Sequence, residues 1–181
     1  MKIELLAHQG RANYANMASS IATTLFDFKK DYLKKSFQTM RKIEHRLEFV
    51  AKLHGITFWN DSKATNVNSA WYALESMKSP IVWIAGGVDN GNDYQSLIPL
   101  VKEKVHTLIC IGVDNEKLIK TFSPFVDNVF ESRSMDQAVY ISYKIGNSGD
   151  SVLLSPACAG FDMFESIEDR GKRFKNAIRE L

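Results

Sequence analysis

The stretch GITFW at residues 55–59 reads as a buried strand, and it runs directly into the polar string NDSKATN at residues 60–66. A helix-like run at residues 67–77 follows, so this part of the chain predicts a strand, a polar corner and a helix. In open α/β sheets, ligands bind at the carboxyl ends of strands, at corners of this kind. Such a corner offers backbone N–H groups and the positive end of a helix, and Lys63 adds a mobile positive charge. The sequence therefore predicts a site here for an anionic ligand such as a phosphate or carboxylate.

Short runs rich in Val, Ile and Leu alternate with helix-like runs from about residue 45 to the end of the chain. They predict strands at residues 47–53, 56–59, 81–85, 107–111, 128–130 and 151–154. They predict helices at residues 67–77, 94–104, 115–122, 135–145 and 164–180. The first two strands are separated by His54-Gly55, which predicts a tight hairpin turn. Alternation with short connections predicts an α/β fold, with a mostly parallel sheet and helices on both faces.

Residues 1–44 have a different pattern, which is mostly helical. Asn13 is expected to cap a helix at residues 14–26, and Asp31 a second helix at residues 32–37. Two short helices cannot bury a core of their own. We therefore expect residues 1–44 to be a remnant of, or a bridge to, something larger, and residues 45–181 to be the folded domain.

Composition excludes several classes of protein. Of the 181 residues, 45% are apolar and 24% are charged, and the net charge is only +2, so neither nucleic acid nor an anionic membrane is expected as a partner. Cys110 and Cys158 form no CxxC pair, which argues against a zinc site or a disulfide framework. The N-terminus carries no signal-like run and no stretch is long enough to span a bilayer, so a cytoplasmic location is expected.

Two further loops fall on the same predicted edge of the sheet. No phosphate loop, GxGxxG fingerprint or HExxH motif occurs in the chain. The loop at residues 86–93 would place Asp89 close to a bound pyrophosphate, so a tight turn that glycine permits is the favoured interpretation. In the loop at residues 154–162, small residues favour either ligand binding through backbone N–H groups or a compact turn, and Asp162 is expected to cap the last helix. Cys158 has no histidine nearby in sequence and is a poor candidate for a nucleophile.

Several short motifs together resemble one family. They are Asn13-x-x-Asn16, His45-Arg46-Leu47-Glu48, NDSKATN at 60–66, Gly86-Gly87, SPACA at 155–159 and Phe164-x-x-x-Glu168-x-Arg170-Gly171. In this order they are similar to the Mur ligases, above all to the members that add D-glutamate to UDP-N-acetylmuramoyl-L-alanine. The resemblance covers nearly the whole chain, and the strings at 60–66 and 155–159 are its most specific parts.

The resemblance implies a fold and a reaction. Mur ligases have three domains, and this chain is similar to the end of the central ATPase domain, residues 1–44, and to the whole Rossmann-like third domain, residues 45–181. The family forms an amide by phosphorylating a substrate carboxylate with ATP and letting the amino acid's amine attack the acyl phosphate. ATP and Mg²⁺ would be bound mainly by the central domain, which together with the N-terminal domain would be the partner of this chain. The chain alone is therefore expected to be inactive.

The resemblance also implies roles for individual residues on the ATP side. Asn13 and Asn16 would contact the adenine end of ATP. Arg46 would reach the phosphates, and Asp61 would reach the ribose. No residue of the chain is assigned to metal binding or to catalysis on this basis.

On the amino-acid side, the resemblance implies that Lys63 and Thr65 help to hold the carboxylates of D-glutamate. Further contact positions in the last loop and helix would be Gly160, Phe161 and Ile167. These residues, with Asn90 in the glycine-rich loop, make up the expected amino-acid site.

Three positions depart from the family pattern. The first motif usually reads Gly-x-His-Asn, whereas the histidine is replaced by Ala12 here. The glycine-rich loop usually carries a lysine that pairs with a glutamate carboxylate, and Asn90 stands in its place. Gly160 replaces a serine hydroxyl. A charge-assisted bond is stronger than a neutral one, so the changes at Asn90 and Gly160 bear on glutamate affinity.

Other functions stay open at this point. The chain could be a stand-alone Rossmann-like module that binds a nucleotide or a small acid. It could belong to a related Mur or folylpolyglutamate-type ligase that adds another amino acid, an alternative that Asn90 keeps open. It could also be a scaffold or interaction domain descended from a ligase.

Overall fold

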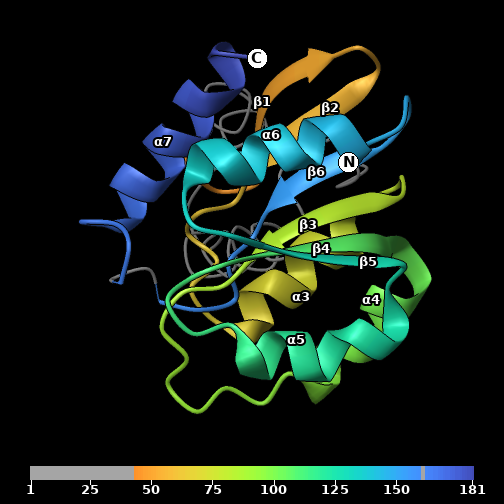
Figure 1. Ribbon diagram of the computed structural model, residues 1–181, viewed down its shortest axis with the longest axis vertical. Coiled ribbons are helices and arrows are strands. Elements are labelled where there is room, and N and C mark those ends of the chain that lie inside the picture. Colours follow the sequence, from red (N-terminus) through yellow and green to blue (C-terminus); the bar gives the residue numbers. More distant parts are fainter. Residues whose placement is uncertain (1–42, 160–161) are drawn as a thin grey trace, which may run out of the picture.

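The protein is described by a computed structural model that covers residues 43–159 and 162–181 (Figure 1). Within these residues six strands form one sheet, in the order β1-β2-β6-β3-β4-β5. The strands are β1 (Glu48–Leu53), β2 (Ile56–Asn60), β3 (Ile81–Ala85), β4 (Val105–Ile111), β5 (Asn128–Ser132) and β6 (Ser151–Leu154). Only β1 runs antiparallel to its neighbour, and the other pairs are parallel. The predicted α/β fold with a mostly parallel sheet is confirmed.

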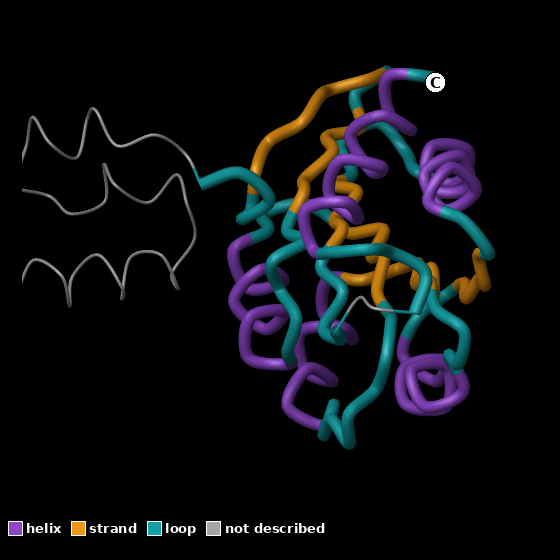
Figure 2. The backbone as a smooth tube through the Cα atoms, turned by 90° about the vertical axis from the view of Figure 1, so that its left-hand side faces the viewer, coloured by secondary structure: helices purple, strands orange, loops and turns teal. Residues whose placement is uncertain are grey.

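Helices connect the strands and cover both faces of the sheet, as Figure 2 shows from the side. They are α3 (Val67–Ser76), α4 (Ile98–Lys104), α5 (Glu116–Phe122), α6 (Met135–Ile145) and α7 (Ile167–Arg179), with 3-10 turns η2 (Gln95–Leu97) and η3 (Ser123–Phe125). Leu74, Val101 and Phe122 from α3, α4 and α5 belong to the apolar cluster on one face. Val139 and Phe174 from α6 and α7 belong to the cluster on the other face.

The central strands are apolar on both sides, because both sides are covered. Along β3, Trp83 belongs to one cluster while its neighbours Val82 and Ile84 belong to the other. All five residues of β3 and all four of β6 are buried. This burial explains why these strands read as continuous apolar runs rather than as alternating ones.

The N-terminal ends of three helices are capped by short polar side chains. Asn66 accepts a hydrogen bond from the Ser69 N–H at the start of α3, and Ser134 does the same for Gln137 in α6. The predicted cap of the last helix was wrong. Ser166 caps α7, while the Asp162 carboxylate accepts hydrogen bonds from the backbone N–H groups of Val113 and Met163, at 2.9 Å each. The helix consequently begins at residue 167 rather than 164.

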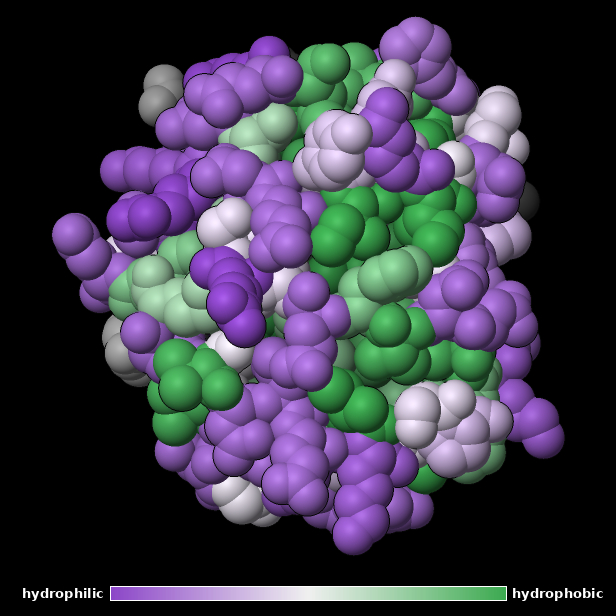
Figure 3. Space-filling model, in the orientation of Figure 1, coloured by the Kyte–Doolittle hydropathy of each residue, from purple (hydrophilic) through white to green (hydrophobic). Residues whose placement is uncertain are grey.

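The helices predicted for residues 14–26 and 32–37, and their caps Asn13 and Asp31, lie outside the described residues. No helix among the described residues is long and apolar enough to cross a bilayer. On the face that carries α6, apolar side chains form an uneven band bordered by hydrophilic residues (Figure 3).

Candidate functional site

Three loops meet at the carboxyl edge of the sheet: the 60–66 loop after β2, the 86–93 loop after β3 and the 155–159 loop after β6. The 155–159 loop is the central one, because β6 lies between β2 and β3. The Ala157 N–H donates to the Ala64 carbonyl at 2.9 Å, which joins it to the 60–66 loop. The Gly86 N–H donates to the Pro156 carbonyl at 2.9 Å, and the Val88 N–H to the Ala159 carbonyl at 2.9 Å. The loops therefore form one hydrogen-bonded unit.

Two glycines make this close approach possible. Gly86 has φ of 126° and Gly87 has φ of 131°, values that side chains with a Cβ rarely adopt. A Cβ at Gly87 would lie 2.1 Å from the Ala159 carbonyl oxygen, and one at Gly86 would lie 2.5 Å from the Ile111 carbonyl oxygen. Gly87 thus lies directly against the 155–159 loop and Gly86 against the end of β4, which a simple tight turn would not require.

Asp61 faces the interior at the start of the 60–66 loop. Its Oδ1 accepts a hydrogen bond from the Leu47 N–H at 3.0 Å, and its Oδ2 accepts one from the Ser155 hydroxyl at 3.2 Å. Burial raises the pKa of Asp61 to about 7, although these hydrogen bonds and Arg46 favour the charged form. The carboxyl group therefore ties Leu47, the residue before β1, and the 155–159 loop to the 60–66 loop.

Arg170 on α7 is fully buried and holds Ser62 in place. Its Nε donates to the Ser62 hydroxyl at 3.0 Å and its Nη2 to the Ser62 carbonyl oxygen at 2.8 Å. The Ser62 hydroxyl donates in turn to the carbonyl of Ile167, the first residue of α7, at 2.7 Å. Burial lowers the pKa of Arg170 to about 10, a value that still leaves the guanidinium charged at neutral pH. Two residues of α7 therefore hold residue 62, and Lys63 follows it directly.

Lys63 and Thr65 lie on the outer part of this corner. The backbone N–H of Lys63 donates to the His45 carbonyl at 3.0 Å. The Lys63 ammonium lies 3.6 Å from the Glu168 carboxylate on α7, and its side chain is 36% exposed. Such an exposed pair is weak, so the ammonium is free to exchange its partner for a ligand carboxylate.

Asn90 is exposed in the 86–93 loop, and a lysine from another element lies nearby. The Lys117 ammonium on α5 is 2.9 Å from the Asp89 carboxylate and 5.5 Å from the centre of the Tyr94 ring. Burial alone would raise the pKa of Asp89, but hydrogen bonds from Lys117 and from the Asn92 N–H lower it below its usual value. The negative charge of Asp89 is therefore compensated by the Lys117 ammonium.

The remaining predicted site residues fall into two groups. Arg46 is half-buried and lies near Asp61, where its charge lowers the pKa of that carboxyl. Ile167 is half-buried and contacts Ser62 through its carbonyl oxygen. The other four predicted residues lie outside the described residues: Asn13, Asn16, Gly160 and Phe161.

Cys158 is buried next to the Tyr94 hydroxyl, which lies 2.9 Å from its Sγ. Burial raises the pKa of the Cys158 thiol, with nearby acidic groups adding to the effect. A buried thiol in its neutral form is a poor nucleophile. The geometry therefore favours a packing role for this side chain.

One acidic cluster among the described residues has donor atoms close enough together to hold a cation: Glu44, His45 and Glu48. The Lys175 ammonium already pairs with Glu44, and it lies 3.3 Å from the Glu48 carboxylate. Because a fixed ammonium neutralises these carboxylates, the cluster does not suit a divalent metal.

Arg170 is the residue whose role the sequence did not reveal. It belongs to the motif Phe164-x-x-x-Glu168-x-Arg170-Gly171, which served only as a marker of resemblance. The one sequence signal for this role was its position four residues before Phe174, because that spacing puts both side chains on the same face of a helix.

Comparison with known protein families and curated proteins gives close matches. Residues 45–158 match the family described as "Mur ligase, glutamate ligase domain". A UDP-N-acetylmuramoylalanine--D-glutamate ligase of Christiangramia forsetii is 52% identical over 177 residues, which are 97% of this chain and 40% of that protein. The enzyme of the same name from Porphyromonas gingivalis is 47% identical over 182 residues, which are 100% of this chain and 40% of that protein. The chain thus spans about 40% of the length of these relatives.

Solved structures with the same fold are more distant in sequence. UDP-N-acetylmuramate-alanine ligase MurC from Thermotoga maritima superimposes with a TM-score of 0.65 at 13% identity, over 94% of this chain and 38% of that chain. MurF ligase from the same organism, in complex with ADP, gives a TM-score of 0.62 at 12% identity, over 94% and 39%. At such identities the likeness shows the fold alone, and it confirms the predicted Rossmann-like architecture.

Proposed function

Because the chain belongs to the Mur ligase family, we propose that its parent protein is an ATP-dependent acid–amino acid ligase of cytoplasmic peptidoglycan precursor synthesis. The proposed reaction joins D-glutamate to UDP-N-acetylmuramoyl-L-alanine, as the names of relatives at 52% and 47% identity suggest. The observation that carries this proposal is the hydrogen-bonded unit of three loops, which places Lys63 and the glycine-rich loop along one edge of the sheet.

Within that parent, residues 45–181 serve as the amino-acid-binding domain, and residues 1–44 belong to the central ATPase domain. The chain contains no GxxxxGK[ST] sequence, and the acidic cluster at Glu44 and Glu48 is occupied by Lys175. ATP phosphates and Mg²⁺ are therefore held mainly by other parts of the parent. The metal supplies charge neutralisation on the transferred phosphate there.

The roles proposed for individual residues follow from charge and position. Lys63 and Thr65 hold the carboxylates of D-glutamate, with Asn90, Gly160, Phe161 and Ile167 completing the amino-acid site. On the ATP side, Asn13 and Asn16 contact the adenine end and Arg46 reaches the phosphates. Asp61 acts on the side of the ribose, from within the protein interior. The amino acid's amine attacks the acyl phosphate and phosphate leaves, so the domain acts by orienting the amine rather than by donating a reactive group.

The test is a phosphate-release assay on the full-length parent protein with ATP, UDP-N-acetylmuramoyl-L-alanine and single amino acids. We expect release that depends on D-glutamate, and none from the 181-residue chain by itself. Release by the chain alone would contradict the assignment of phosphate binding to another domain. Lack of a D-glutamate response in the parent would contradict the substrate.

A second candidate is a ligase of the same family that adds another amino acid. Asn90 favours it, since this exposed position lacks the cation that would pair with the second carboxylate of glutamate. If the substrate is D-glutamate, Asn90→Lys should lower its KM in the parent. The second candidate would be established by two results together. The KM for D-glutamate would be unchanged in Asn90→Lys, and the parent would prefer an amino acid with a single carboxylate.

A further inference from the structure

Residues 43–47, here called the entry segment, lead from residues 1–42 into β1. Within this segment His45 has φ of 63° and Leu47 has φ of 42°, in the left-handed region that residues with a Cβ rarely adopt. Such a backbone persists only where neighbouring groups hold it in place. The contacts of the entry segment are therefore expected to be specific.

Two backbone groups of the entry segment pair with the loop after β2. The Leu47 N–H donates to the Asp61 carboxylate at 3.0 Å, and the His45 carbonyl accepts from the Lys63 N–H at 3.0 Å. The His45 N–H donates to the Glu48 carboxylate in β1, at 2.9 Å. The position of the Lys63 backbone thus depends on where the His45 carbonyl is held.

Asn60, the last residue of β2, is fully buried and joins the entry segment to the elements around it. Its Nδ2 donates to the Gly171 carbonyl in α7 at 3.2 Å and to the Glu48 carboxylate in β1 at 3.3 Å. The same nitrogen lies 2.9 Å from the His45 Nδ1. Its Oδ1 accepts from the Ser62 N–H at 3.2 Å. One side chain therefore contacts β1, α7, the entry segment and the loop after β2.

These contacts fix the orientation of the Asn60 amide. A flipped amide would set its oxygen against the Gly171 carbonyl oxygen and its NH₂ group against the Ser62 N–H. Because an amide NH₂ group only donates, the His45 Nδ1 is the acceptor, and the ring is neutral with its proton on Nε2. His45 is 2% exposed, and burial is the main cause that lowers its pKa, which favours this neutral form.

Helix α7 packs against the His45 ring. A Cβ at Gly171 would lie 2.2 Å from the His45 Nδ1, so glycine is required here to leave room for the ring. Gly171 follows Arg170, whose guanidinium holds Ser62. The same turn of α7 thus holds Ser62 directly and encloses the ring that Asn60 binds.

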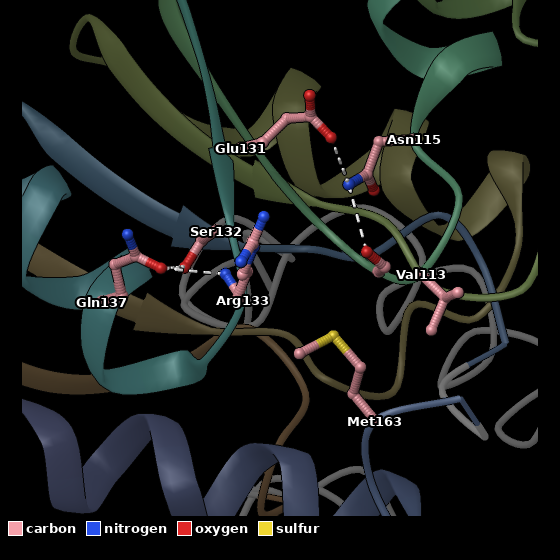
Figure 4. A pocket seen from close by; sticks show the side chains of 8 residues that line it. Val113, Asn115, Glu131, Ser132, Arg133, Gln137 and Met163 are labelled. Carbon is pink, nitrogen blue, oxygen red and sulfur yellow. Dashed lines mark hydrogen bonds between the residues drawn. The ribbon is translucent and has the colours of Figure 1, made fainter.

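A cavity of about 600 Å³ opens beyond the carboxyl ends of β4 and β5, beside Asn115 and Met163 (Figure 4). It lies away from the entry segment, because β2, β6 and β3 separate β1 from β4 in the sheet. At this cavity the Arg133 backbone N–H donates to the Gln137 Oε1 at 2.9 Å. This hydrogen bond is therefore a reference that a change at Asn60 should not reach.

We infer that Asn60 is a positioning residue for the proposed amino-acid site. By holding the His45 ring it fixes the His45 carbonyl, and that carbonyl fixes the Lys63 backbone. The direction in which the chain enters the domain and the position of Lys63 are therefore set by the same buried contact. Asn60 is fully buried, so it acts through His45 and Lys63 rather than by touching a substrate. The inference rests on the proposed function for the role of Lys63, whereas the contact itself can be tested without it.

The contact is tested by amide hydrogen exchange in the 181-residue chain that carries Asn60→Ala. We expect exchange at the Lys63 and Leu47 N–H groups to become at least about tenfold faster, because the entry segment is released, and exchange at the Arg133 N–H to stay unchanged. His45→Phe keeps a ring but removes the Nδ1 acceptor, so it should accelerate exchange at the Lys63 N–H in the same way. This second variant decides the question if Asn60→Ala does not fold. The inference is overturned if exchange at the Lys63 N–H is unchanged, or if the Arg133 N–H is accelerated equally.

The role in the site is tested by steady-state kinetics of the full-length parent protein with Asn60→Ala, Lys63→Ala and both changes together. We expect Asn60→Ala to raise the KM for D-glutamate by at least about fivefold, the effect of one hydrogen bond, and to leave the KM for ATP within about twofold. In the Lys63→Ala background the same change should cost less than about twofold more, since Asn60 acts through Lys63. Thr107→Val is the control, because it removes a buried hydroxyl at the start of β4, and it should change neither KM.

A merely structural role for Asn60 would give a different result. It would lower kcat with both KM values unchanged, or its losses would multiply with those of Lys63→Ala, and either result would overturn the inference. A wild-type parent that shows no turnover dependent on D-glutamate would contradict the proposed function instead. The hydrogen-exchange result would still decide whether Asn60 holds the entry segment against Lys63.

Discussion

Arg170 donates hydrogen bonds to both the hydroxyl and the carbonyl oxygen of Ser62, at 3.0 Å and 2.8 Å, across 108 positions of the sequence. This contact connects the last helix to the residue that precedes Lys63. The geometry of the proposed amino-acid corner therefore depends on a side chain that does not itself reach the solvent.

Replacing Arg170 by lysine should destabilise the fold. Lysine keeps the charge but loses the planar fork that reaches both Ser62 atoms, so a buried carbonyl and a buried ammonium are left poorly paired. We expect the free energy of unfolding in urea to fall by about 2–3 kcal/mol, the usual scale for charged hydrogen bonds.

Arg173→Lys on the exposed face of the same helix is the matched control. Arg173 forms an exposed i,i+4 pair with Asp169 and lies 6.0 Å from the centre of the Phe164 ring, contacts that a lysine can largely keep, so its replacement should change the free energy of unfolding by no more than about 0.5 kcal/mol. Equal effects of the two substitutions would show that the buried contact with Ser62 contributes nothing specific.

Asp61 should make the stability depend on pH. Burial raises its pKa from 3.8 to about 7 in the folded state, so the folded state holds this proton more tightly than the unfolded state does. Its contribution to stability is full below about pH 4 and is lost as the pH rises toward 7. Each unit of pKa difference corresponds to about 1.4 kcal/mol, so the loss is on the order of 4 kcal/mol.

Asp61→Asn should remove this dependence and be more stable than the wild type at pH 8. The comparison isolates Asp61 from His45, whose pKa is lowered chiefly by burial and whose contribution has the opposite sign, being lost as the pH falls. Urea unfolding at pH 5, 6, 7 and 8 measures the difference. A wild type and a variant with the same pH profile would show that Asp61 is ionised in the folded protein.

Gly87→Ala should disrupt the contact between the 86–93 and 155–159 loops. The new Cβ would lie 2.1 Å from the Ala159 carbonyl oxygen, so the backbone must move. We expect a loss of at least about 2 kcal/mol in the free energy of unfolding and faster hydrogen exchange at the Val88 N–H.

Gly91→Ala is the control within the same loop. Gly91 also has a positive φ, of 82°, but a Cβ there would meet no atom within 4 Å. Only the conformational cost of about 1 kcal/mol should remain. If the two substitutions cost the same, the close approach of the loops has no energetic importance.

The sequence predicted the fold well because its signals are local. The runs at 56–59, 81–85 and 151–154 match β2, β3 and β6 to within one residue, and His54-Gly55 forms the predicted hairpin turn between β1 and β2, with φ of 48° and 85°. Where the boundaries differ, pairing with a neighbouring strand decides them. β4 begins at Val105 rather than at residue 107, since Val105 pairs with Ile81 in β3.

The site was predicted less completely because its contacts are not local. The polar string at 60–66 identified the corner, but nothing near it in sequence indicates that Arg170 holds Ser62. The wrong cap at Asp162 has the same origin, because its carboxylate is bound by the N–H of Val113, 49 positions away. The cavity beside Asn115 likewise depends on how two strand ends and the loop at Met163 are brought together.

The most direct test of the proposed amino-acid site is the steady-state kinetics of Lys63→Ala in the full-length parent protein, with D-glutamate as the varied substrate. Lys120→Ala, an exposed lysine on α5, is the control. We predict at least about a tenfold rise in KM for D-glutamate or a comparable fall in kcat, and no change in the control. Kinetics of Lys63→Ala that match those of the wild type would contradict the assignment of the 60–66 corner to the substrate.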